Sequence, residues 1–60
     1  MRFVPIGNLA VCAARIVAVK IFGNCVIVYC DNNADYRMGF RTGIEAQEAY
    51  EALMKELEKN

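Results

Sequence analysis

Residues 16–31 read IVAVKIFGNCVIVYCD, and this stretch decides the fold. Two runs of β-branched and apolar residues meet at a Gly-Asn pair, which predicts a two-residue turn of type II′ because Gly23 occupies its first central position. This turn fixes the pairing of the two strands, which runs in register as far as Val17 opposite Cys30. Since side chains alternate between faces, one face is uniformly apolar and is expected to form the core. It carries Val17, Val19, Ile21, Val26, Val28 and Cys30.

Residues 35–41 alternate with a period of two and predict a third strand. A three-residue loop, Asn32-Asn33-Ala34, with an Asn in the left-handed conformation, connects it to the hairpin. A two-residue loop would turn the arginines of this strand inward and is rejected. The expected loop places three residues beside Cys30, Val28 and Val26 on the core face, in that order: Tyr36, Met38 and Phe40.

A helix is expected over residues 43–58. Thr42-Gly43-Ile44-Glu45 matches the capping box, in which the Thr hydroxyl and the Glu carboxylate bind free backbone N–H groups. An apolar stripe follows at spacings of three and four residues, and it is expected to pack on the core face of the sheet. The stripe consists of Ala46, Ala49, Tyr50, Leu53, Met54 and Leu57.

The sequence therefore predicts one small α+β domain over residues 1–60, an antiparallel β-meander with one C-terminal helix packed on one face. Three to five short strands are expected, over residues 2–6, 9–12, 16–22, 25–31 and 35–41.

The first fifteen residues fit more than one path. The segment Ile6-Gly7-Asn8-Leu9 repeats the pattern of the later turn and favours a second hairpin. Alternatively the segment crosses the sheet once, with Pro5 marking an edge strand. A third hypothesis folds it over the second face of the sheet as a lid.

The second face of the predicted sheet is unusually apolar for a surface that meets solvent, where polar alternation is expected. It carries Ile16, Ala18, Lys20, Phe22, Cys25, Ile27, Tyr29, Arg37, Gly39 and Arg41. In the expected register Arg37 stands opposite Tyr29. Arg41 stands opposite Cys25 and near Phe22. Because aromatic and Arg residues dominate interface energies, six of these residues are the candidate protein interface: Lys20, Phe22, Ile27, Tyr29, Arg37 and Arg41.

Charge is segregated along the chain. Residues 1–42 hold five basic and two acidic residues, a net charge of +3, whereas residues 43–60 hold two basic and five acidic residues, a net charge of −3. The preference of short helices for Glu explains part of this difference. The remainder indicates that the sheet prefers an acidic partner.

The residue types argue against an enzyme and against a bound cofactor or metal. The chain has no histidine, and it contains no phosphate-binding loop or nucleophile elbow. Asp31, Asn33 and Asp35 alternate like the first ligands of a calcium loop, but the required Gly and bidentate Glu are missing, and hairpin turns explain the same residues. Three cysteines without a CxxC pair predict reduced, packed thiols.

Cytoplasmic location without membrane insertion is expected. The longest uncharged run, residues 3–14, is shorter than the roughly 20 residues of a transmembrane helix. The start of the chain has some character of a secretory signal, but turn residues interrupt its apolar stretch, and its removal would leave too little chain to fold.

Two functional hypotheses follow. The first is a small protein-binding module, of the regulator or inhibitor type, that buries its second face against its own copy as a homodimer or other homo-oligomer, or against a larger acidic protein. The second is single-stranded nucleic-acid binding, with Tyr29 and Phe22 stacking on bases while Lys20, Arg37 and Arg41 meet phosphates. A pI near 6.1 and the absence of a basic cluster favour the first.

Overall fold

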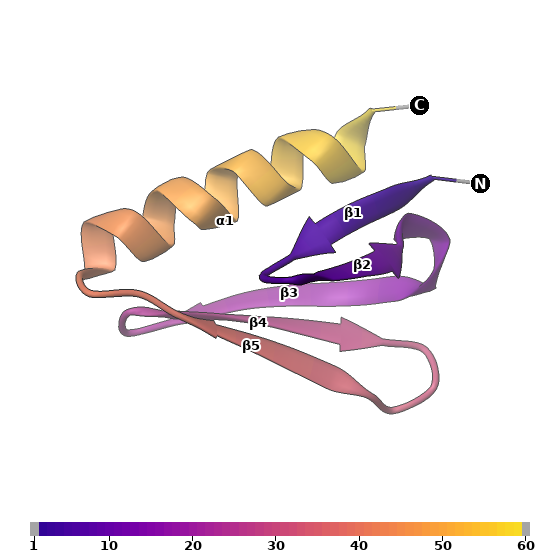
Figure 1. Ribbon diagram of the computed structural model, residues 1–60, viewed down its shortest axis with the longest axis horizontal. Helices are drawn as coiled ribbons and strands as arrows, with labels where there is room; N and C mark the ends of the chain where they lie inside the picture. The colour runs from indigo at the N-terminus through magenta and orange to yellow at the C-terminus, as the bar shows by residue number, and fades with distance from the viewer. Residues whose placement is uncertain (1, 60) are drawn as a thin grey trace.

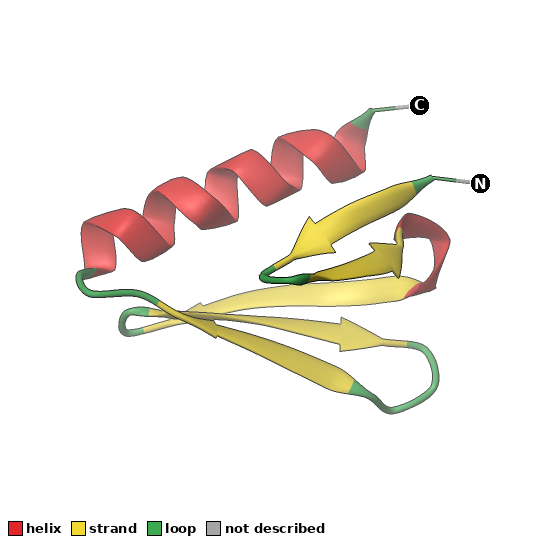
Figure 2. Ribbon diagram, viewed as in Figure 1, coloured by secondary structure: helices red, strands yellow, loops and turns green. Residues whose placement is uncertain are grey.

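A computed structural model of the chain, which describes residues 2–59, confirms the predicted α+β fold (Figures 1 and 2). The elements in chain order are β1 (Phe3–Ile6), β2 (Leu9–Cys12), a 3-10 turn η1 (Ala13–Arg15), β3 (Ile16–Phe22), β4 (Cys25–Cys30), β5 (Asp35–Gly39) and α1 (Gly43–Glu58). They form two antiparallel sheets, the hairpin β1-β2 and the meander β3-β4-β5.

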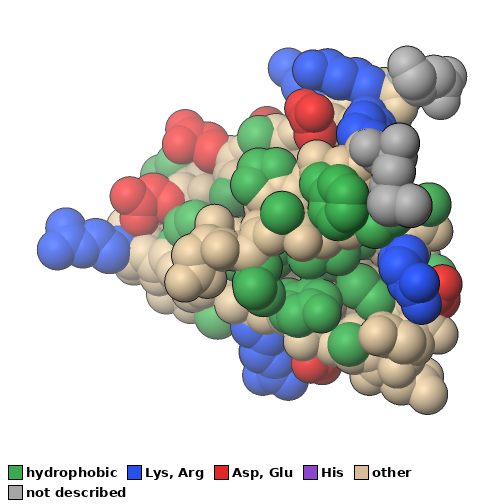
Figure 3. Space-filling model, turned by 45° about the vertical axis from the view of Figure 1, so that its right-hand side comes forward, with side chains coloured by type: hydrophobic (Ala, Val, Ile, Leu, Met, Phe, Trp, Pro, Cys, Tyr) green, Lys and Arg blue, Asp and Glu red, His purple; other side chains and the backbone are tan. Residues whose placement is uncertain are grey.

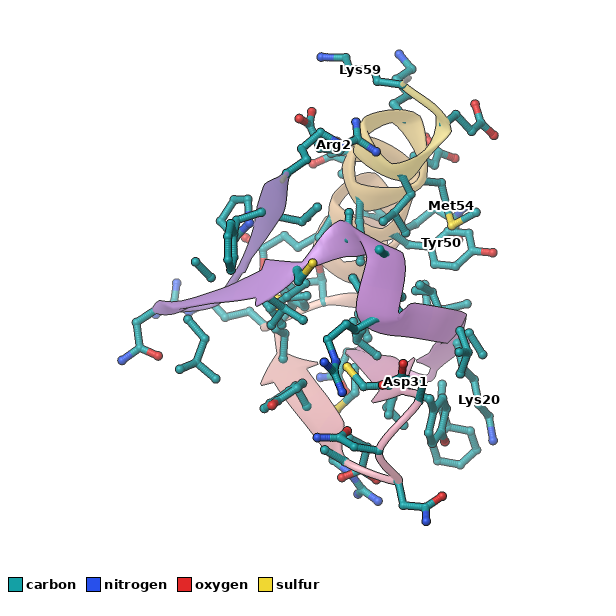
Figure 4. The ribbon with its side chains drawn as sticks, turned by 90° about the vertical axis from the view of Figure 1, so that its right-hand side faces the viewer. Arg2, Lys20, Asp31, Tyr50, Met54 and Lys59 are labelled. Carbon is teal, nitrogen blue, oxygen red and sulfur yellow. The ribbon has the colours of Figure 1, made fainter. Side chains whose placement is uncertain are left out.

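The helix and the N-terminal hairpin lie on the same side of the three-stranded sheet (Figures 1 and 4). Between them is a small core in which the hairpin, the central strand and the helix each supply two residues: Val4, Ile6, Val26, Val28, Ala46 and Leu53. Tyr36, Met38 and Phe40 pack against this core as predicted. The opposite side of the sheet carries no helix or strand from residues 2–59.

The β3-β4 hairpin follows the predicted register except at its open end. Gly23 has a φ of +61°, as the first position of a type II′ turn requires, and pairing is as expected from the turn to Ala18. Beyond it Cys30 pairs with Ile16, where Val17 was expected, because a β-bulge inserts one extra residue. Val17 is therefore 65% exposed, and Ile16 packs against the core in its place.

The register of β5 is two residues away from the prediction. Cys30 donates its N–H to Ala34, so the three loop residues are 31–33, one position earlier than expected. The reason is Asn33, whose φ of +66° is the left-handed conformation that closes a three-residue hairpin loop. The predicted loop would have required this conformation at Ala34, where a Cβ disfavours it. Since the shift is even, every side chain of β5 stays on its predicted face.

The N-terminal segment forms the predicted hairpin, with Gly7 at a φ of +63° in its turn. Val4 and Ile6 are buried in the core. The lid hypothesis is thus wrong, because the hairpin packs on the helix side of the sheet. Within residues 2–59 no helix is long and apolar enough to cross a membrane.

The helix begins at its predicted cap. Thr42 accepts a hydrogen bond on Oγ1 from the N–H of Glu45 at 3.2 Å. The Glu45 carboxylate accepts from the N–H of Arg41 at 3.1 Å, one residue before the position expected for a capping box. Both bonds fix the direction in which the helix leaves β5.

Arg2 connects the beginning of β1 to the end of the helix (Figure 4). Its guanidinium donates to the carbonyl of Glu56 at 2.6 Å and to that of Leu57 at 3.4 Å. The last carbonyls of a helix lack partners within the helix and carry its negative dipole end, so a cation there is stabilising. Arg2 therefore holds the hairpin against α1.

Replacing Arg2 by alanine is expected to lower the free energy of unfolding by about 1 kcal/mol, since a charge-assisted hydrogen bond to a helix end is lost. Lys59→Ala is the matched control. Lys59 is a cation at the same end of the helix, but its ion pair with Glu56 is solvent-exposed and is expected to contribute a few tenths of a kcal/mol. Urea unfolding followed by circular dichroism measures both, and equal losses would contradict the role given to Arg2.

Candidate protein-interaction site

The outer face of the sheet, turned away from the helix, consists of three cross-strand rows. Strand register defines them, because residues that pair across strands point to the same side. The end row next to the β3-β4 turn holds Phe22, Cys25 and Gly39; the middle row holds Lys20, Ile27 and Arg37; and the far row holds Ala18, Tyr29 and Asp35.

Ile27 is buried although it lies on the outer face. It is 6% exposed, and its direct neighbours in the middle row are Lys20 on one side and Arg37 on the other. Long basic side chains cover apolar neighbours with their methylene stems while the charges stay in water. The predicted contact residue Ile27 therefore offers a partner almost no surface of its own, although two of the cations expected around it are its direct neighbours.

Phe22 is the largest exposed apolar side chain of the outer face, with 69% of its surface in solvent. The ammonium of Lys20 lies 5.5 Å from the centre of its ring, within the range of a cation–π contact. At the other end of β3 the bulge exposes Val17 next to Ala18. The exposed apolar surface thus follows β3, whereas Tyr29 on the central strand is half-buried.

The shift of β5 changes the predicted charge distribution. Arg37 stands opposite Ile27, where Tyr29 was expected, and Asp35 takes the place opposite Tyr29. Arg41 lies beyond the end of β5 and pairs with no residue of β4, because the strand ends at Gly39. Four of the six predicted residues therefore lie together on the outer face as exposed or half-buried side chains: Lys20, Phe22, Tyr29 and Arg37. The charged groups of this face are the cations of Lys20 and Arg37 and the carboxylate of Asp35.

The surface around the N-terminal hairpin is a second apolar region, which the sequence reasoning missed. One groove, of about 420 Å³, separates the hairpin from α1 and β5 and is lined by Val4, Pro5, Met38, Ala49, Ala52, Leu53 and Glu56. Another, of about 580 Å³, lies between the hairpin and the β4-β5 end and is lined by Phe3, Ala10, Val11, Cys12, Ala14, Arg15, Cys30, Asn32 and Tyr36. Figure 3 shows hydrophobic side chains gathered in the middle of the molecule, between charged groups. The absence of charge from residue 3 to 14 was the signal that could have revealed it.

Side chains of the loop that was considered as a calcium site contact other groups of the protein. The carboxylate of Asp31 forms an ion pair with the guanidinium of Arg15 at 3.3 Å. Asn32 accepts a hydrogen bond on its side chain from the N–H of Ala34, which is an Asx turn. Within residues 2–59 no group of three His, Cys, Asp or Glu side chains is placed to hold a metal ion.

Comparison with known proteins adds no relative to this picture. No protein-family model, curated protein or solved structure matches the chain.

Proposed function

We propose that this chain is a small, non-enzymatic protein-binding module that acts through its outer face and associates with its own copy. The observation that carries the proposal is Phe22, a large aromatic side chain 69% exposed on a sheet face that no helix or strand of residues 2–59 covers. Exposed aromatic residues beside Arg and Lys are the usual anchors of protein interfaces. A module of this kind works as a regulator or inhibitor by occupying its partner's surface.

The small core supports self-association. More than half of the residues are apolar. Yet within residues 2–59 the largest side chains that are fully buried are only valines, namely Val4, Val26 and Val28. A chain of 60 residues removes only about 60% of its unfolded surface from water. Covering the outer face in a homo-oligomer adds the burial that one copy cannot supply.

A larger acidic protein is the alternative partner, since Lys20 and Arg37 project from the middle of the outer face. We place the interaction in the cytoplasm, because Cys12, Cys25 and Cys30 are free thiols and small secreted domains usually depend on disulfides.

Nucleic-acid binding is the less favoured function. Lys20 and Phe22 do lie together, as a base-stacking site with a phosphate contact would need. However, Asp35 occupies the same face beside Tyr29, where its carboxylate would repel phosphates. Binding of a single-stranded oligonucleotide that weakens steeply with salt would favour this function over the proposed one.

The proposed function is tested by sedimentation equilibrium of the chain from micromolar to millimolar concentration. A reversible dimer is expected, at the weak end of interface strength, because a face three strands wide buries less than about 1,200 Å² in total. Phe22→Ala is expected to raise the dimer dissociation constant about 30-fold, which corresponds to a hot-spot loss of about 2 kcal/mol.

Phe3→Ala is the matched control, because Phe3 is also an exposed aromatic residue, 53% in solvent, but lies on the N-terminal hairpin. It is expected to leave the dissociation constant within about twofold. If Phe3→Ala separates the copies and Phe22→Ala does not, the contact lies on the hairpin and the proposed face is wrong. A chain that stays monomeric at millimolar concentration would remove self-association altogether.

A further inference from the structure

Strand β2 of the N-terminal hairpin has an open edge. The direction of its backbone groups follows from Ala13, which donates its N–H to the carbonyl of Arg2 at 2.9 Å, because hydrogen-bonded and non-hydrogen-bonded pairs alternate along an antiparallel hairpin. Counting along the register from that bonded pair, Ala10 and Cys12 belong to non-hydrogen-bonded pairs. Their N–H and C=O groups therefore point away from β1, and within residues 2–59 no strand pairs with them.

The other strand edges carry features that hinder pairing with a further strand. Pro5 removes a donor from the edge of β1, and β3 has Lys20 and the bulge at Val17. Strand β5 carries charged side chains at alternate positions. The sequence of β2, in contrast, is Leu-Ala-Val-Cys, without a charge, a proline or a bulge.

The groove of about 580 Å³ lies along the open edge of β2, since Ala10, Val11 and Cys12 line it. Its opposite side is formed in part by Cys30 and Tyr36, which point to the core side of the three-stranded sheet. An extended segment beside β2 would thus find backbone partners along one side and apolar side chains beneath it. We propose that this groove binds an extended, uncharged segment of a partner protein, which adds to the hairpin as a third strand.

The charge of the groove defines the chemistry of this segment. Arg15 is the only charged residue among the described residues that line the groove, and its guanidinium forms an ion pair with Asp31 at 3.3 Å. A charged side chain of the bound segment would therefore lose water without gaining an unpaired opposite charge. The segment is expected to be uncharged.

The register of β2 defines which position of the segment is apolar. Two residues of an antiparallel segment pair with Ala10 and Cys12 and exchange four backbone hydrogen bonds with them. The residue between these two lies opposite Val11. It points to the same side as Val11, whose side chain packs against the core, so it enters the groove and should be apolar.

A single segment fits this site better than a second folded copy. The inner face of β2 in a second copy is already covered by the core of that copy, against which Val11 packs. Pairing of two β2 strands would therefore bring the Cys30 and Tyr36 regions of both copies into the same space beneath the joined hairpins. The site lies on the helix side of the three-stranded sheet, so it is separate from the outer face and does not depend on self-association.

The proposal is tested by selecting phage-displayed random heptapeptides on the whole chain. The enriched peptides are expected to be uncharged, with an apolar residue flanked by residues of high β propensity. One enriched peptide is then synthesised with capped ends, and its dissociation constant is measured by fluorescence anisotropy. Failure to enrich any peptide, or enrichment of charged peptides only, would overturn the proposal.

Ala10→Pro removes one donor from the open edge. The N–H of Ala10 faces away from β1, as does the position of Pro5 directly opposite, so a proline is compatible with the hairpin there. It is expected to raise the dissociation constant of the peptide about tenfold or more, because a peptide carbonyl loses its donor. Ala10→Val is the matched control, since it adds similar bulk but keeps the N–H, and it should stay within about threefold.

Amide hydrogen exchange followed by nuclear magnetic resonance tests the site in the unchanged chain, whether or not Ala10→Pro folds. Without peptide, the amides of Ala10 and Cys12 should exchange faster than that of Val11, which bonds within the hairpin. Saturating peptide is expected to slow exchange at Ala10 and Cys12 at least tenfold. A bound peptide that leaves both amides unchanged would overturn the site, whereas the proposed function would still be decided by the effect of Phe22→Ala on self-association.

Discussion

Replacing Leu53 by alanine is expected to unfold most of the protein at 25 °C. Leu53 is 6% exposed and is the largest side chain that the helix contributes to the core. Truncation of a buried Leu to Ala costs about 2–5 kcal/mol, through lost transfer free energy and the cavity that remains. A single core of this size rarely supplies more than about 3–5 kcal/mol, so the loss is comparable to the whole stability of one copy.

Ile44→Ala is the control for Leu53→Ala. Ile44 is on the same helix but is 73% exposed, and surface substitutions usually change stability by no more than about 0.5 kcal/mol. Far-ultraviolet circular dichroism at several temperatures, together with urea titration, measures both variants. A loss below about 1 kcal/mol for Leu53→Ala would contradict the packing of α1 on the sheet.

The second large effect is expected at Ala46, where a larger side chain has no room. Ala46 is 0% exposed and belongs to the core cluster in the first turns of the helix. Ala46→Leu should cost about 1–3 kcal/mol, because extra methylene groups in a packed core force neighbouring side chains or backbone to move. The cost is expected although leucine is nearly as good a helix former as alanine.

Ala52→Leu is the matched control, the same substitution on the same helix at an exposed position. It is expected to leave the free energy of unfolding within about 0.5 kcal/mol. Thermal unfolding by differential scanning calorimetry compares the two variants. Equal melting temperatures would show that the helix does not approach the sheet closely at Ala46.

Local sequence rules predicted most of the fold because each element carries its own signal. The period of two in residues 18–30, the glycine at position 23 and the Thr42 cap are all short-range features, and the structure has each of them. The core face followed from alternation, and it was correct for every residue of β4.

The bulge at Val17 could not be predicted in this way, because it depends on contacts made outside the hairpin. Arg15 accepts a backbone hydrogen bond from Asp31 at 2.9 Å and forms an ion pair with its carboxylate. These contacts hold the strand ends in a register one residue away from the one that the turn sets. The extra residue is accommodated at Val17, and Ile16 enters the core.

The candidate site was predicted less well than the fold, because it depends on which residues stand side by side across strands. The position of one left-handed residue, Asn33, moved Arg37 beside Ile27 and Asp35 beside Tyr29. Alternation gave the correct face for each residue, but it carries no information about neighbours along that face.

The contact between Arg2 and the carbonyls of Glu56 and Leu57 has a consequence for biosynthesis. The hairpin of residues 3–12, which contains no charged side chain, is synthesised before the helix that packs beside it. We therefore expect the nascent chain to expose this uncharged hairpin until the helix has been synthesised, which makes the hairpin a substrate for chaperones that bind hydrophobic stretches.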